Sequence, residues 1–349
     1  MSTRLPSRNR GFTIVELLVV MGIIAILLAL LAPALGGAKR RGDKFRETNA
    51  LREVSKAWNL YANAFSGAAL PGYLDPPMQG PSPGWNVEYE YHTPPPGAPG
   101  TTNIVIPQAI AAPWTWRLLP FLSYNHDVIH GHLDEPNVDQ SNMTDMTPPV
   151  AESEAWEIAD EPGFGYNGYY VGGYWEMVNI GGDEIPRYRF FGATVDLNSD
   201  GSIGPRKFAS VVVRSISHIR RSTELVVFCS SSKVVPGVYK KWNNDRPGHH
   251  IVIPPWLADV KQWGFPIGGP GGPGGPGGGT RTVAAAGDIW TIEAFVPTSV
   301  PIARYTKSSV VVYADGHTAN QSASDLMDMR QWIDTADKKD YQHLPGDPG

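Results

Sequence analysis

The chain has 349 residues, of which 42% are apolar and 18% charged, and its formal net charge is −5. This composition is too apolar for general disorder, and the negative net charge argues against nucleic acid as a partner. A single cysteine, Cys229, excludes an internal disulfide, so we expect a buried strand residue there and a fold held by its core. The 38 glycines and 32 prolines predict many turns and long loops.

The amino terminus joins a basic segment to a long apolar run. Residues 1–11 are polar with three arginines, and residues 12–35 are almost continuously apolar except for Glu16. Residues 17–38 carry no charge and span about 33 Å as a helix, enough to cross a hydrocarbon layer of about 30 Å. The pattern predicts a membrane-spanning helix with one carboxylate near its start.

An ordinary cleavable secretory signal is the alternative explanation of this segment. Ala32-Pro33-Ala34 offers a small-residue cleavage site of the usual kind. However, the apolar run exceeds the usual 7 to 15 residues of a signal, and Glu16 is costly inside a membrane segment. A plain signal or anchor has no use for that carboxylate.

Residues 11–20, GFTIVELLVV, resemble the processing and methylation motif of type IV pilins and type II secretion pseudopilins. The resemblance implies cleavage by a prepilin peptidase between Gly11 and Phe12, N-methylation of Phe12, and Glu16 as the fifth mature residue. It also implies that the Phe12 amine of a neighbouring subunit neutralises Glu16 during assembly, so that Glu16 sets subunit register. Pro33 matches the family's helix-kinking proline.

The next segment, residues 36–66, predicts an amphipathic continuation of this helix. Apolar side chains recur at three- and four-residue spacing from Leu51 to Phe65, with charged residues between them. We expect the helix to continue through Gly36-Gly37, to kink at Pro33 or at the glycines, and to pack on a β-sheet. A separate helix after a flexible joint is the alternative.

Residues 70–113 are crowded with proline and glycine and predict a long connection with short strands at 87–91 and 103–106. Residues 114–122 then resemble a W-x-x-x-L-x-P-[YF]-L-like segment of large pilin-like proteins of planctomycetes and their relatives. Residues 163–178 predict strands and tight turns, whose aromatic side chains fit core packing better than carbohydrate stacking.

The second half of the chain predicts an antiparallel sheet followed by a closing helix. The expected strands are residues 188–195, 209–215, 224–229, 289–295 and 308–314. Residues 268–279 repeat GGP and predict a flexible loop. A helix over 322–338 would place Leu326, Met329, Trp332 and Ile333 on one face.

The segment Tyr305-x9-Asp315-Gly316 is close to the H-x9-D-G signature of processed prepilin-type proteins, with Tyr305 in place of the histidine. This difference argues against a role that needs the imidazole. Asp315-Gly316 predicts a two-residue hairpin turn and a structural role for Asp315.

Two groups of side chains are candidate metal sites. Asp196, Asn198 and Asp200 reproduce the first half of an EF-hand-like calcium loop, but Lys207 stands at its twelfth position, and a β-turn is the alternative.

The second group could hold zinc, although a polar surface turn explains it as well. It consists of His126, His130, His132, Asp134 and Glu135.

The chain contains no P-loop or C-x-x-C motif, and we do not expect an enzyme.

The predicted architecture is α+β and pilin-like: a long amino-terminal helix packed on an antiparallel β-sheet head with long loops. The expected organisation is a leader at 1–11, a transmembrane and filament-core helix at 12–35, its amphipathic continuation at 36–66, and a head at 67–349.

The resemblance implies a single-pass protein of the cytoplasmic membrane with a periplasmic head, which becomes filament-associated or extracellular after assembly. Its expected partners are prepilin peptidase, other pilin or pseudopilin subunits, an assembly platform with its ATPase, and membrane lipid. The expected function is that of a minor subunit of a secretion pseudopilus or type IV pilus-like filament. The alternative is a membrane-tethered periplasmic binding protein or hydrolase with an aromatic ligand site.

Overall fold

The computed structural model describes two compact units, Met1–Phe45 and Arg46–Gly349, which we call the anchor unit and the head unit. The described residues are 14–79, 88–91, 102–105, 110–131, 159, 161–180, 183–188, 211–234, 248–257, 260–261, 263–264, 281–285, 288–292, 298–301 and 308–341.

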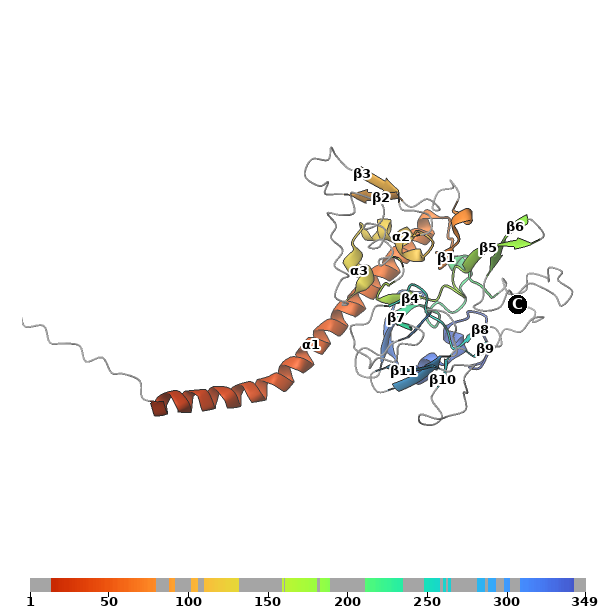
Figure 1. The fold of residues 1–349 in the computed structure, drawn as a ribbon. Helices are drawn as coiled ribbons and strands as arrows, with labels where there is room; N and C mark the ends of the chain where they lie inside the picture. Colours follow the sequence, from red (N-terminus) through yellow and green to blue (C-terminus); the bar gives the residue numbers. More distant parts are fainter. Residues whose placement is uncertain are drawn as a thin grey trace, which may run out of the picture. The chain divides into compact units, whose positions relative to one another are not determined.

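One helix, α1 (Ile14–Ala64), begins in the anchor unit and ends in the head unit (Figure 1). It runs unbroken past Pro33 and Gly36-Gly37, so the expected continuation is confirmed and the alternative of a separate helix is wrong. Within the head unit its apolar stripe is buried, whereas Arg52, Glu53 and Lys56 are exposed. This is the amphipathic pattern predicted from the sequence.

The main sheet of the head is antiparallel, in the order β13-β7-β14-β15, with β4 also paired to β7. Its strands are β4 (Phe164–Tyr166), β7 (Val226–Val234), β13 (Thr298–Pro301), β14 (Ser309–Tyr313) and β15 (Thr318–Gln321). The α+β architecture with an antiparallel sheet is therefore confirmed.

Smaller sheets and short helices complete the described residues. β1 pairs in parallel with β5, and β5 pairs with β6, while β10-β12-β11, β2-β3 and β8-β9 are antiparallel.

The strand bounds are β1 (Tyr73–Leu74), β2 (Glu88–Tyr91), β3 (Thr102–Val105), β5 (Tyr174–Ile180), β6 (Asp183–Tyr188), β8 (Trp256–Leu257), β9 (Val260–Lys261), β10 (Trp263–Gly264), β11 (Arg281–Ala285) and β12 (Asp288–Ile292).

The short helices are η1 (Pro76–Met78), α2 (Trp114–Leu118), η2 (Leu119–Leu122), α3 (His126–His130), η5 (Ile216–His218), α5 (Ala323–Leu326) and η6 (Met329–Gln331).

The central strands β7 and β14 are buried on both faces of the sheet. Because successive strand residues point to opposite faces, Val310 and Val312 of β14 pack in the core cluster that contains the α1 stripe. Val311 and Tyr313 pack instead with the carboxy-terminal segment. This explains why β14 has three consecutive valines rather than alternating apolar and polar residues, and it confirms that the helix packs on the sheet.

Polar contacts fix the carboxy-terminal segment to the second face. The buried Asn167 side chain donates through Nδ2 to the carbonyls of Val226 and Trp332, each at 2.9 Å. The Asp334 carboxylate accepts the backbone N–H groups of Arg220 and Arg221 at 3.0 Å. These contacts satisfy polar groups that would otherwise be costly to bury.

Several predicted strands are confirmed and one is wrong. β2, β3, β7, β12 and β14 lie where strands were expected, although β7 extends to Val234. Of the strand predicted at 188–195, Tyr188 ends β6 and residues 189–195 lie outside the described residues.

In contrast, 211–215 forms no continuous strand. The carbonyl of Arg214 accepts a hydrogen bond from the Ala69 N–H. Val213 instead donates its N–H to the Tyr170 carbonyl and accepts the Gly172 N–H. Because neighbouring residues bond to different segments, no continuous ladder forms.

The single closing helix over 322–338 is also wrong, because the segment divides into α5 and η6. The Asp328 carboxylate accepts the N–H of Arg330 at 3.1 Å, and such local capping competes with helix continuation. The predicted face is nonetheless correct, since Leu326, Met329, Trp332 and Ile333 are all fully buried.

The loop between β14 and β15 differs from the expected two-residue turn. The Gly316 N–H donates to the carbonyl of Tyr313 at 2.8 Å, and the Tyr313 N–H donates to the carbonyl of His317 at 3.0 Å. The loop therefore has three residues, and Gly316 adopts φ +89°, which a side chain would strain.

Candidate functional site

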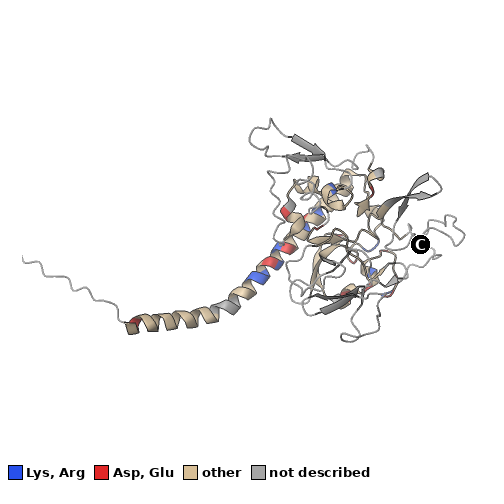
Figure 2. Cartoon of the chain, viewed as in Figure 1, with Lys and Arg blue, Asp and Glu red and all other residues tan. Residues whose placement is uncertain are grey.

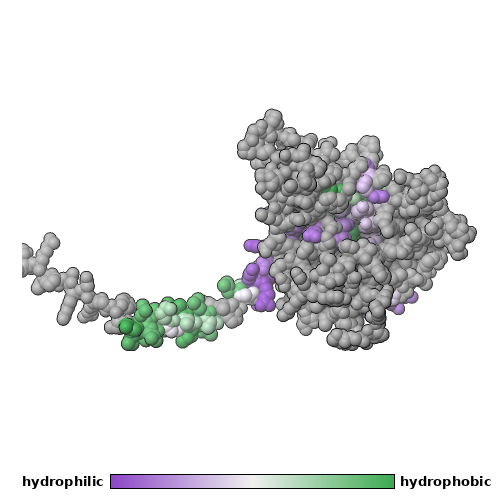
Figure 3. All heavy atoms as spheres, in the orientation of Figure 1, coloured by the Kyte–Doolittle hydropathy of each residue, from purple (hydrophilic) through white to green (hydrophobic). Residues whose placement is uncertain are grey.

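The anchor unit presents an apolar surface along α1. The large apolar side chains that the structure describes from Ile14 to Leu30, and Leu35, are 45–83% exposed, and they are drawn in green shades in Figure 3. The helix is long and apolar enough to cross a membrane by length and composition. Because each such side chain gains about 1.5–3 kcal/mol when it leaves water, this surface requires a lipid or protein environment.

Glu16 interrupts this apolar surface in the first turn of α1, where its side chain is exposed. A carboxylate near a helix amino terminus is favoured by the partial positive charge of the helix dipole. The structure thus places an acid at the start of the apolar helix, where the sequence predicted it.

Other members of the predicted processing motif have no described side chain. Gly11 and Phe12 lie outside the described residues, and Pro33 is described only as part of the α1 backbone. Cleavage, methylation and the kink therefore stay predictions.

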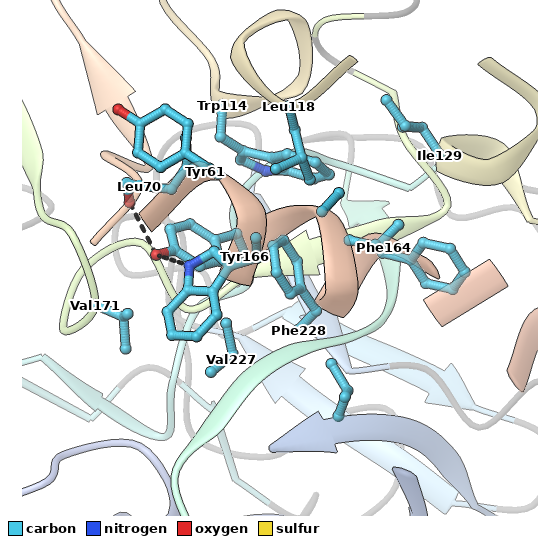
Figure 4. Close-up of a cluster of buried hydrophobic side chains, with 14 of the residues drawn as sticks. Tyr61, Leu70, Trp114, Leu118, Ile129, Phe164, Tyr166, Val171, Val227 and Phe228 are labelled. Atoms are coloured by element: carbon cyan, nitrogen blue, oxygen red, sulfur yellow. Dashed lines mark hydrogen bonds between the residues drawn. The ribbon is translucent and has the colours of Figure 1, made fainter. Parts of the chain in front are cut away.

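A buried hydrogen-bond chain joins the carboxy-terminal part of α1 to the head. Trp58 Nε1 donates to Tyr166 Oη at 3.1 Å, and Tyr166 Oη donates to the carbonyl of Leu70 at 2.8 Å (Figure 4). Burial raises the pKa of Tyr166, so its hydroxyl stays protonated and can act as a donor. We call Trp58, Tyr166 and Leu70 the junction.

Aromatic packing surrounds the junction. The Trp114 ring centroid lies 5.0 Å from that of Phe228, and the Tyr166 centroid lies 4.7 Å from Phe228 (Figure 4). On the other side, Tyr61 of α1 contacts Phe121 at 5.8 Å between centroids. The aromatic residues of 114–122, which we call the tryptophan segment, therefore pack in the core that holds α1.

Arg117 is a buried cation that the sequence did not single out. It donates through Nη1 to the carbonyls of Ala112 at 2.9 Å and Pro113 at 3.2 Å. Burial lowers its pKa to about 10, opposed by the nearby Tyr61 and Tyr73. The sequence feature that could have indicated its burial is the position of this single charge among the apolar residues of the tryptophan segment.

The proposed histidine cluster is only partly described. His126 and His130 are the first and last residues of α3, but the His126 side chain and residues His132, Asp134 and Glu135 lie outside the described residues. Burial lowers the pKa of His130 to about 4, against the effects of Asp127 and the Glu161 backbone.

Among the residues that the structure describes, no three histidine, cysteine or acidic side chains are grouped to hold a metal. Asp196, Asn198 and Asp200 lie outside this set, so the calcium loop, like the zinc site, stays a prediction.

Asp315 and Cys229 both have structural surroundings. The Asp315 carboxylate accepts from the backbone N–H of His317 at 3.0 Å and contacts its Nδ1 at 2.6 Å, which closes the hairpin loop. Cys229 is a fully buried residue of β7, as expected, and burial raises the pKa of its thiol. A protonated, enclosed thiol is a poor nucleophile.

The amino-terminal geometry agrees with one comparison with known proteins. Residues 6–32 match the model of the prokaryotic N-terminal methylation motif, which covers less than a tenth of the chain. No curated protein and no solved structure matches the chain significantly. The matched motif, together with an apolar helix suited to single-pass anchoring, supports a type IV pilin-like prepilin, a structural subunit processed by prepilin peptidase and assembled with other pilin subunits.

Proposed function

We propose that the chain is the precursor of a minor subunit of a type II secretion pseudopilus or type IV pilus-like filament. Prepilin peptidase would cleave it between Gly11 and Phe12 and methylate the new amino terminus. The observation that carries the proposal is an exposed apolar helix whose first turn contains Glu16, within the matched methylation motif.

The apolar surface of α1 suits both stages of such a life cycle. Before assembly it would lie in the lipid of the cytoplasmic membrane with the head in the periplasm, and after extraction it would pack against the same surface of neighbouring subunits. Lipid and apolar helices are similar environments, so exchanging one for the other costs little hydrophobic free energy. An assembly platform and its ATPase would supply the work of extraction.

Glu16 would fix the axial position of each subunit relative to its neighbours. A carboxylate in an apolar environment needs a compensating positive group, and the Phe12 amine created by cleavage is one. If it comes from the adjacent subunit, only one axial offset between helices pairs the charges. Cleavage would therefore prepare the subunit for assembly as well as remove the leader.

The large head supports a specialised subunit rather than the bulk of a filament. The head unit extends from Arg46 to Gly349, and its junction couples α1 directly to the sheet. The segment at 114–122 and Tyr305-x9-Asp315-Gly316 resemble those of large-headed relatives of the kind found in planctomycetes. The head would then bind cargo, substrate or another subunit.

Mass analysis of the native amino terminus tests the proposal. We expect a mature chain that begins at N-methylated Phe12, and a Gly11→Val variant that keeps its leader in the same cells. A native chain beginning at Leu35 would indicate ordinary signal cleavage, and a retained leader would indicate a tethered binding protein or hydrolase. Either result would overturn the proposal.

A further inference from the structure

A short basic segment follows the apolar part of α1. Residues 39–44, which we call the basic collar, contain Lys39, Arg40, Arg41 and Lys44 with one acid, Asp43. Lys39, Arg40 and Arg41 are exposed, whereas Asp43 and Lys44 are partly buried. Figure 2 shows this charged band on α1 next to its uncharged portion.

The three exposed cations point to different sides of the helix. Consecutive residues of an α-helix are about 100° apart, so Lys39, Arg40 and Arg41 spread over about 200° of the helix circumference rather than lie in one narrow stripe. A single protein partner docks on one side of a helix. A membrane surface, in contrast, surrounds a spanning helix completely, and the distribution of the collar fits that geometry.

The collar also lies at the depth where lipid headgroups begin. The exposed apolar side chains that begin at Ile14 reach Leu35, four residues and about 6 Å before Lys39, and the next large one, Phe45, follows the collar. Lysine and arginine side chains can extend their charged ends toward the interface while their apolar stems stay in lipid. The charges therefore coincide with the polar boundary of a bilayer that the helix spans.

The exposed cations are available for an external anion. Lys39, Arg40 and Arg41 form no ion pair with any residue that the structure describes, although Asp43 is close in sequence. This contrasts with Lys56 on the same helix, which pairs with Glu53 at 2.6 Å. A cluster of unpaired cations at a membrane boundary attracts anionic lipid.

We propose that the basic collar binds the headgroups of anionic phospholipids in the leaflet at which the membrane helix ends. These contacts hold the subunit at a fixed depth and oppose its extraction. The proposal rests on the membrane anchoring in the proposed function and does not depend on filament assembly. It makes lipid charge a determinant of how readily subunits leave the membrane.

The test uses the full chain in bilayers that contain equal amounts of phosphatidylglycerol and phosphatidylcholine. Electron paramagnetic resonance with spin-labelled lipids measures the relative association of each lipid with the protein. We expect the unmodified chain to prefer phosphatidylglycerol and the variant K39Q/R40Q/R41Q to lose that preference, with each cation contributing up to about fivefold. About 1 M salt should reduce the preference of the unmodified chain, because it screens charges beyond about 3 Å.

A matched control removes the same number of exposed positive charges elsewhere. The variant R52Q/K338Q/K339Q should keep the preference, since these three residues are exposed but lie outside the collar. The proposal is overturned if the unmodified chain shows no preference, if the collar variant retains it, or if the control loses it equally. It is also overturned if the collar variant changes only self-association, because the collar then serves a second copy of the chain.

Alkaline carbonate extraction of membranes separates this proposal from the one on which it rests. A chain released by carbonate is not membrane-anchored, and the proposed function fails with the collar. A chain that resists carbonate but shows no lipid preference leaves the anchoring intact and overturns the collar alone.

Discussion

The two ends of α1 have the same secondary structure and opposite surroundings. In the anchor unit, apolar side chains are exposed on all sides of the helix, whereas Leu51, Val54 and Trp58 in the head unit are at most 1% exposed. The difference follows from the residue pattern, which is apolar all round in the first part and confined to a stripe in the second. One helix therefore combines a surface made for lipid or other subunits with a surface made for its own head.

This contrast implies that assembly and folding can be changed separately. Substitutions in the anchor unit should affect association while the head keeps its stability. Substitutions in the buried stripe should destabilise the head while the anchoring segment is unchanged. The predictions that follow test this separation from the largest expected effect to the smallest.

The variant Glu16→Leu should abolish filament incorporation. It removes the only carboxylate of the apolar segment, and with it the charge that is proposed to pair with the Phe12 amine of a neighbouring subunit. Crosslinking of membranes and sheared filament fractions would measure incorporation. The thermal midpoint of the head should be unchanged.

The matched control is Glu53→Leu, which also replaces an exposed α1 carboxylate by leucine but lies in the head unit. It loses only a surface pair with Lys56 and should assemble normally, because such pairs contribute about 0–1 kcal/mol. Normal assembly of Glu16→Leu would contradict the proposed role of this residue.

Trp58→Ala should lower the free energy of unfolding of the head by about 3–5 kcal/mol. It creates a cavity beside Tyr166 and removes the indole donor of the junction. Chemical denaturation followed by fluorescence would measure the loss. Trp58→Phe should cost less, because it removes the hydrogen bond and retains most of the packing.

Leu60→Ala is the control for the buried stripe. Leu60 is 52% exposed on the same helix, so we expect a change within about 0.5 kcal/mol. Equal effects at Trp58 and Leu60 would show that the stripe does not fix α1 to the head.

The head should lose stability as pH falls from about 6.5 to about 4 because of His130. Its native pKa is lowered to about 4, so over this range the unfolded chain binds a proton that the native state does not. The full shift corresponds to about 3 kcal/mol. The side chain of the variant His130→Asn cannot titrate. Its free energy of unfolding, measured by denaturation at a series of pH values, should therefore fall less steeply with acid than that of the unmodified chain.

His218→Asn provides the comparison, since it makes the same substitution at an exposed histidine at the end of η5. An identical slope in the His130 variant and the unmodified chain would contradict the assignment to His130.

Local patterns predicted much of this fold from particular residues. The spacing of Leu51, Val54 and Trp58 predicted the buried stripe, and the valines of β14 predicted a strand. The face of Leu326, Met329, Trp332 and Ile333 was correct, although the element was not, because Asp328 caps the chain locally and ends the helix that the spacing indicated.

Contacts distant in sequence account for what the patterns missed. Arg117 is buried only because β1 and α1 lie beside the tryptophan segment, and His130 acquires its lowered pKa only from burial in the fold. Residues 211–215 look like a strand from composition, but their hydrogen bonds divide between residues 68–69 and 170–172. None of these partners can be read from neighbouring residues.

The sequence by itself determined the amino-terminal half of α1, its single acid and the methylation motif, because lipid compatibility depends only on the local run of side chains. The tertiary structure alone decided which face of the sheet receives α1, how Tyr166 links Trp58 to Leu70, and how the closing segment divides. The physical reason is that the composition of an apolar segment alone determines whether it is more stable in lipid than in water. A buried polar group, in contrast, specifies its position only through partners that folding brings together.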